Sequence, residues 1–120
     1  MKSKLKKAGS ETNAEIVARS MHRMRNPLIV IATKKGNYHK IVSNIMEIKA
    51  RGGNVIAIVS KGDTEIEKLA NHVIEIPECD ELIAPILANI PLQLLSYYIA
   101  DKKGCNVDQP RNLAKSVTVE

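Results

Sequence analysis

The sequence contains no tryptophan and no phenylalanine, and its only aromatic side chains are those of Tyr38, Tyr97 and Tyr98. Any hydrophobic core must therefore be built from aliphatic side chains. A chain of 120 residues buries roughly two-thirds of its unfolded surface, which is enough for one modest core. We therefore expect one domain, or part of one.

Cysteine is scarce, and long apolar runs are absent. The two cysteines, Cys79 and Cys105, have neither the density of a disulfide framework nor the spacing of a zinc site, and they suit a reducing compartment. No apolar run reaches the ~18 residues of a membrane span, and the sequence shows no secretory leader. We expect a soluble, cytoplasmic protein that does not bind membranes.

The net positive charge of the chain comes entirely from its N-terminal segment. Residues 1–26 contain seven lysines and arginines and two glutamates, whereas residues 27–120 contain eleven basic and eleven acidic residues. A basic arm can bind nucleic acid, but this one has no aromatic side chain to stack on a base. We therefore expect a solvated extension over 1–26, with a short amphipathic helix over 13–24, and no nucleic-acid partner.

The rest of the chain alternates between strand and helix patterns. Continuous apolar runs predict strands that are covered on both faces, at residues 28–33, 54–60 and 72–77. Helical patterns lie at residues 38–50, 65–70 and 82–103. Either Asp63 or Thr64 can cap the second of these helices. The alternation predicts an α/β fold with a parallel sheet. Three strands make a thin sheet that lacks cover, so we expect half of a larger doubly wound domain and association between chains.

Ligands of such folds bind beyond the carboxyl ends of the strands, where this sequence reads TKKGN, SKGDT and PECDE. The first two have neither P-loop nor dinucleotide-binding spacing, which favours ordinary strand-to-helix turns. The three carboxylates of ECDE could hold a metal ion, but acids at a helix start are favoured by its dipole, and we predict no metal site. His72 is expected to meet solvent or a backbone carbonyl. No nucleophile and base stand out as a pair.

The C-terminal sequence ELIAPILANIPLQLLSYYIADKKGCNVDQPRNLAKSVTVE, together with SNIMEIKARGG and its flanking strands, resembles one enzyme family. It is similar to the isomerase domain of the glutamine:fructose-6-phosphate aminotransferases, or glucosamine-6-phosphate synthases, over residues 27–120. The resemblance implies a sugar-isomerase (SIS) fold, a three-layer flavodoxin-like parallel sheet with helices on both faces. Residues 27–120 would form the C-terminal part of the second of two such modules, with a catalytic tail at 105–120.

The resemblance also implies a chemistry. The family converts fructose 6-phosphate and glutamine-derived ammonia to glucosamine 6-phosphate, without a cofactor. By position in RNLAKS, Lys115 would form a Schiff base with the open-chain ketose, and the backbone of Ala114 would contact the sugar. An unperturbed lysine has a pKa near ~10.4. Desolvation and the nearby Arg111 would favour the neutral, nucleophilic amine.

Several parts of the family pattern are missing from this sequence. It lacks the glutaminase domain, the first SIS module with its phosphate-binding loop, and the segments that supply acid–base groups, and His22 is out of register with the family histidine. We therefore expect the isolated chain to be inactive, although its parent enzyme would act on sugar phosphates. The alternatives are a non-catalytic phosphosugar-binding module and a dimerisation module, and in each case we expect a homo-oligomer.

Overall fold

The computed structural model describes residues 13–109. In chain order, its elements are α1 (Asn13–Met21), β1 (Pro27–Ala32), α2 (Tyr38–Ala50), β2 (Asn54–Ser60), α3 (Glu65–Leu69), β3 (His72–Ile76) and α4 (Ala84–Lys102). The predicted strands and helices are all present, with ends that differ from the predicted ones by three residues or fewer.

The three strands form one parallel sheet in the order β1-β2-β3. Pro27 lies opposite Asn54 in the first pair, and Ile56 lies opposite His72 in the second. Each strand therefore ends at the same edge of the sheet, as the prediction of an α/β fold with a parallel sheet requires, and that prediction is confirmed.

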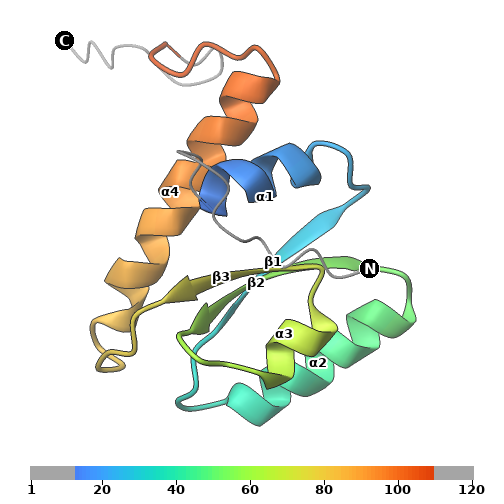
Figure 1. Ribbon diagram of the computed structural model, residues 1–120, viewed down its shortest axis with the longest axis vertical. Helices are drawn as coiled ribbons and strands as arrows, with labels where there is room; N and C mark the ends of the chain where they lie inside the picture. Colours follow the sequence, from blue (N-terminus) through green and yellow to red (C-terminus); the bar gives the residue numbers. More distant parts are fainter. Residues whose placement is uncertain (1–12, 110–120) are drawn as a thin grey trace, which may run out of the picture.

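The sheet lies between two helical layers, α2 with α3 on one face and α1 with α4 on the other (Figure 1). Successive side chains of a strand point to opposite faces, so the apolar residues of β2 divide between two cores. The first core joins Val55, Ala57 and Val59 to α2 and α3. The second joins Ile56 and Ile58 to β3, α1 and α4.

The expectation that all three strands lack cover is wrong for the central strand, where every residue from Val55 to Ser60 is buried. It holds at β1, whose Leu28, Ile29 and Ile31 are exposed. The expectation is also wrong for one face of β3, an edge strand whose His72, Ile74 and Ile76 are buried. The difference between the two edge strands follows from helical cover, since α1 and α4 pack over β3 rather than over β1.

Helix α2 shows how the sequence sets an element's ends. Tyr38, Val42 and Ile45 lie on its buried face, at the spacing of one side of a helix. At its end Gly52 adopts a φ of 77°, which is accessible to glycine without a Cβ penalty. The Gly53 amide then donates to the Ile48 carbonyl at 2.9 Å and closes the last turn.

The helix predicted over 13–24 ends at Met21. The expectation that this segment is solvated is wrong for α1, because Val17 and Ala18 are buried in the second core, where α1 packs against α4. The small side chain of Ala18 permits close approach of the two helices. The division of the chain at residues 26 and 27 stays a prediction. Within residues 13–109, α4 continues through Pro91, and no helix combines the length and hydropathy needed to cross a bilayer.

Candidate functional site at the carboxyl edge of the sheet

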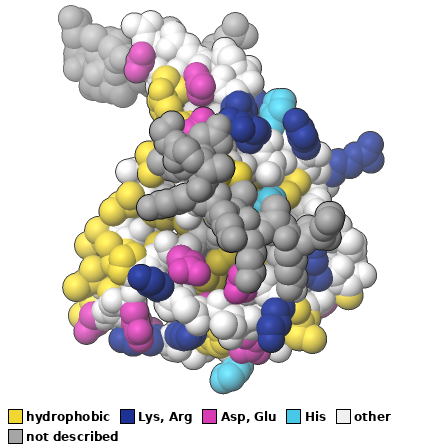
Figure 2. Space-filling model, viewed as in Figure 1, with side chains coloured by type: hydrophobic (Ala, Val, Ile, Leu, Met, Phe, Trp, Pro, Cys, Tyr) yellow, Lys and Arg dark blue, Asp and Glu magenta, His cyan; other side chains and the backbone are white. Residues whose placement is uncertain are grey.

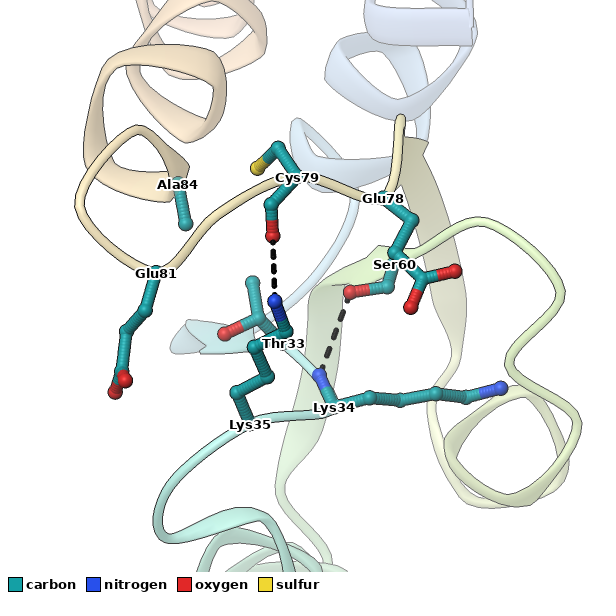
Figure 3. Close-up of a pocket in the computed structure, with 8 residues that line it drawn as sticks. All are labelled: Thr33, Lys34, Lys35, Ser60, Glu78, Cys79, Glu81 and Ala84. Carbon is teal, nitrogen blue, oxygen red and sulfur yellow. Dashed lines mark hydrogen bonds between the residues drawn. The ribbon is translucent and has the colours of Figure 1, made fainter.

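The carboxyl ends of the three strands meet around a small hollow (Figure 3). Its wall contains residues from the loops that follow β1 and β3, together with the last residue of β2 and the first residue of α4. These residues are Thr33, Lys34, Lys35, Glu78, Cys79, Glu81, Ser60 and Ala84. The Lys34 amide donates to the Ser60 hydroxyl at 3.3 Å, which ties the end of β1 to the end of β2. The arrangement is the usual one for ligand sites in open α/β sheets.

Two lysines at this edge are already engaged with the protein itself. The amino group of Lys34 donates to the Gly62 carbonyl at 3.3 Å, and that of Lys35 donates to the Cys79 carbonyl at 3.2 Å. Figure 3 shows the two side chains running in different directions, so their charges do not converge on one point. The lysines therefore join the loops to one another, which is a structural role for the TKKGN turn.

The hollow has a volume of about 10 Å³, which is roughly the space that one water molecule needs. A sugar phosphate is many times larger. The hollow is therefore too small, as it stands, to enclose such a ligand.

The acidic loop before α4 also has a structural role. The carboxylate of Asp80 accepts a hydrogen bond from the Leu82 amide at 3.1 Å, which starts the turn that leads into α4. Gly36 has a φ of 68°, a conformation that favours glycine. A Cβ at this position would also lie only 3.2 Å from a carboxylate oxygen of Glu81. Over residues 13–109 there is no group of three or more side chains that could hold a metal ion.

A buried pair behind this edge was missed by sequence reasoning. The Tyr38 hydroxyl donates to the Asp63 carboxylate at 2.6 Å, and the other carboxylate oxygen accepts from the amides of Glu65 and Ile66 at 3.0 and 2.9 Å. Burial, and then the hydrogen bond to Asp63, raise the pKa of Tyr38 well above its usual value. Of the two predicted caps of α3, Asp63 is the one that acts. The sequence did contain one sign of this pair, because the Tyr38 hydroxyl is the one polar group on an otherwise apolar helix face and needs a hydrogen-bond partner when buried.

The histidines lie in different surroundings. His22 and His39 are exposed, whereas His72 is buried and its Nδ1 has no hydrogen-bond partner among the described residues. Burial lowers the pKa of His72. The expectation that a carbonyl or solvent would satisfy this ring is therefore wrong for Nδ1, because the strand start is covered by the second helical layer.

The two residues predicted to act on the sugar, Lys115 and Ala114, lie outside the described residues. The structure does describe the segment that leads toward them. Gly104, with a φ of 69°, ends α4, and the side chain of Asn106 then accepts hydrogen bonds from the amides of Asp108 and Gln109 at 3.1 and 3.0 Å. The chain thus leaves α4 through a defined turn.

A parallel sheet between two helical layers, with its loops gathered at one edge, is the architecture of an α/β ligand-binding module, and comparison with known families gives its class. The model of the SIS domain family matches residues 8–100, and the chain belongs to this family.

Individual relatives narrow the class. The chain is 62% identical, over 94 residues, to the glutamine–fructose-6-phosphate aminotransferase of Bacteroides thetaiotaomicron, covering 78% of this chain and 15% of that protein. It is 60% identical to the Thermus thermophilus enzyme of the same name, of which it covers 16%. A solved C-terminal domain of glucosamine-fructose-6-phosphate aminotransferase from Francisella tularensis matches with a TM-score of 0.63 and 38% identity, over 69% of this chain and 24% of that chain. The chain is therefore homologous to the SIS-containing isomerase region of these enzymes and spans about 15% of the length of such relatives.

Proposed function

We propose that this chain supplies the C-terminal part of a site that makes glucosamine 6-phosphate from fructose 6-phosphate and ammonia. The observation that carries the proposal is the 62% identity over 94 residues to an enzyme named for the aminotransferase reaction. Identity at this level is far above what a shared fold alone requires, because many functions share one fold.

In the proposed reaction, the neutral amine of Lys115 attacks the C2 carbonyl of open-chain fructose 6-phosphate. Water leaves, and a protonated imine joins the lysine nitrogen to C2. Ammonia then adds to C2, and the lysine takes up a proton and leaves as the free amine, so that C2 now carries an imine to the ammonia-derived nitrogen. Loss of a proton from C1 and protonation of the nitrogen give an enaminol, and transfer of the C1 hydroxyl proton away from oxygen with protonation of C2 gives an aldehyde at C1 and an amine at C2. Ala114 would hold the sugar through its backbone.

The described residues do not form a sugar-phosphate site by themselves, which fits a proposal in which they supply only part of one. The hollow at the strand ends has room for about one water molecule, and the amino groups of Lys34 and Lys35 are held by carbonyls. Sugar-phosphate binding must therefore involve residues beyond this edge, such as the tail that follows the Asn106 turn. We expect the isolated chain to be inactive, because its sequence does not contain the family's phosphate-binding loop or the segments that supply acid–base groups.

A chimera provides the test. Residues 27–120 would replace the homologous region of the Bacteroides thetaiotaomicron relative. One sample of the chimera would receive fructose 6-phosphate and glutamine to measure turnover, and a second would receive fructose 6-phosphate and sodium borohydride to trap the imine. We expect glucosamine 6-phosphate synthesis and a reduced sugar adduct that peptide mass spectrometry assigns to Lys115. Lys115→Arg keeps the positive charge but cannot form the imine, so it should abolish both the adduct and turnover.

Lys103→Arg is the matched control, because Lys103 is an exposed lysine at the end of α4, and it should change neither result. An adduct on Lys34, Lys35 or Lys61 in the active chimera would overturn the assignment. Synthesis of glucosamine 6-phosphate by the isolated 120-residue chain would show that the described edge is more competent than its geometry suggests.

A second candidate function is that of an association module without catalysis, and the exposed apolar residues of β1 and α4 favour it. This function predicts self-association of the isolated chain and no change in its melting temperature on addition of millimolar fructose 6-phosphate. Stabilisation of the isolated chain by the sugar phosphate would instead support the phosphosugar-binding alternative.

A further inference from the structure

The segment that follows α4 takes a path set by hydrogen bonds rather than by packing. Every residue from Asp101 to Gln109 is exposed. Figure 2, in the same view as Figure 1, shows the end of α4 projecting from the rest of the molecule. Contact with other described elements therefore does not fix the course of this segment, which depends on the hydrogen bonds that it forms with itself.

The first of these hydrogen bonds end the helix. The Gly104 amide donates to the Asp101 carbonyl at 2.9 Å. The Cys105 amide donates to the Ala100 carbonyl, also at 2.9 Å. Together they form a Schellman motif, and the φ of 69° at Gly104 is the left-handed conformation that this motif requires.

The next hydrogen bonds depend on one side chain. The side-chain oxygen of Asn106 accepts from the amides of Asp108 and Gln109, at 3.1 and 3.0 Å. Asparagine favours such turns because its short side chain reaches backbone groups two or three residues further on. The next residue is Pro110, which disfavours the helical conformation at Gln109. Asn106 therefore sets the direction in which the chain continues beyond α4.

We infer that Asn106 is a positioning residue for Lys115, an inference that rests on the function proposed above. Lys115 follows Gln109 by six residues, and six residues span at most about 20 Å. The direction in which the chain leaves the turn thus limits where the lysine amine can be placed. That amine must come within about 3–3.5 Å of the ketose carbonyl before the imine can form. Asn106 acts on the reaction through the path of the chain and makes no contact with the sugar.

Substitutions at this position change the side chain and leave the backbone free to keep its conformation. Among residues 13–109, Asn26 is the one non-glycine residue with a positive φ, so alanine can adopt the backbone conformation of Asn106. Asn106→Ala removes the acceptor of both hydrogen bonds, whereas Asn106→Asp keeps an oxygen in the same place. Asn44, an exposed residue of α2, supplies the matched control Asn44→Ala.

The first measurement follows the turn itself in the full 120-residue chain. We expect the backbone NMR order parameters of residues 107–109 to fall in Asn106→Ala, because these parameters report motion on the ps–ns timescale. They should stay at the wild-type level in Asn106→Asp and in Asn44→Ala. Unchanged order parameters in Asn106→Ala would overturn the inference, since the turn would not depend on this side chain.

The second measurement follows the chemistry in the chimera that carries residues 27–120. We expect Asn106→Ala to lower kcat by about tenfold, together with the rate at which the borohydride-reduced adduct forms on Lys115. The KM for fructose 6-phosphate should change by less than about threefold, because the phosphate-binding loop of the relative is unaltered. Asn106→Asp should restore both rates, and neither variant should change the melting temperature. Asn44→Ala should behave as the wild type.

The outcomes separate this inference from the proposed function. If the wild-type chimera forms no adduct on Lys115, the proposed function fails and the inference fails with it. If the wild-type chimera forms the adduct and Asn106→Ala forms it at the same rate, the inference alone is overturned. A lower rate that Asn106→Asp does not restore would also overturn it, because the side-chain oxygen would not be the group that acts.

Discussion

The hydroxyl of Tyr38 donates a 2.6 Å hydrogen bond to the carboxylate of Asp63, and so joins the first residue of α2 to the loop before α3. Asp63 is 2% exposed and accepts from three donors. Replacing it with alanine leaves these donors without a partner. We expect Asp63→Ala to lower the free energy of unfolding by about 2–4 kcal/mol.

Asp63→Asn removes the negative charge of this side chain but keeps its ability to form hydrogen bonds, so it separates the two contributions to stability. Its amide oxygen can still accept from the amides of α3, and its amide nitrogen can donate to the Tyr38 oxygen. We expect a loss of only about 1 kcal/mol. Urea unfolding followed by circular dichroism measures both variants, and equal losses would show that Asp63 does not act through these hydrogen bonds.

The raised pKa of Tyr38 makes stability depend on alkaline pH. In the unfolded chain a tyrosine ionises near pH ~10, whereas burial and the Asp63 carboxylate raise the pKa of Tyr38 in the folded chain. The unfolded state therefore loses its proton first, and the free energy of unfolding falls as the pH rises above about 10.

Tyr38→Phe removes this ionisation and leaves every other titrating group in place. The stability advantage of the wild type over Tyr38→Phe should accordingly shrink above pH ~10, by up to about 1.4 kcal/mol per pH unit. Denaturant unfolding at several pH values from about 8 to 11 measures the difference. A constant difference across this range would count against the buried, protonated tyrosine.

His72 should make the free energy of unfolding fall as the pH is lowered, the opposite direction to Tyr38. Burial lowers its pKa in the folded chain, so below the unfolded value of about 6.5 the unfolded state binds a proton more readily. Stability that is present above this pH is lost as the pH falls through the folded pKa.

His72→Val places a strand-forming apolar residue on the face that also carries Ile74 and Ile76. We expect the variant to lose less stability than the wild type between about pH 7.5 and about pH 5. The exposed His39 supplies the control, since His39→Gln should lose as much as the wild type. If His72→Val and the wild type follow the same pH profile, the buried imidazole is not the source of the dependence.

Adjacent residues of α2 offer a matched test of the first core. Ile45 is 0% exposed and Met46 is 55% exposed. We expect Ile45→Ala to lower the free energy of unfolding by about 2–5 kcal/mol, because it removes apolar contacts and leaves a cavity. Met46→Ala should change it by less than about 1 kcal/mol, as is usual for a surface substitution. Similar losses at both positions, measured by urea unfolding, would mean that α2 does not pack as described.

The fold was predictable because its signals are local. The apolar runs fixed the three strands to within one residue at each end, and Gly52 marked the end of α2. The hydrogen bonds of the candidate site were not predictable, since Tyr38 meets Asp63 and Lys35 meets Cys79 across 25 and 44 residues of chain. Periodicity carries no information about which distant loop carbonyl will accept from a lysine. The roles of Lys115 and Ala114 came from resemblance alone and stay predictions.

The strands lie in the sheet in the same order as in the chain, and this order has a consequence for folding. Strands β1, β2 and β3 can join the sheet one after another as the chain is synthesised, because each pairs with the strand made just before it. Helix α1 is the exception, since it packs mainly on α4, which follows the other described elements in the chain. The layer of α1 and α4 therefore cannot be complete before α4 is made, and until then Ile56, Ile58 and Ile74 lack the α4 residues of their core. A nascent chain halted before residue 84 would thus expose the part of the sheet's apolar face that α4 covers to chaperones and to other chains.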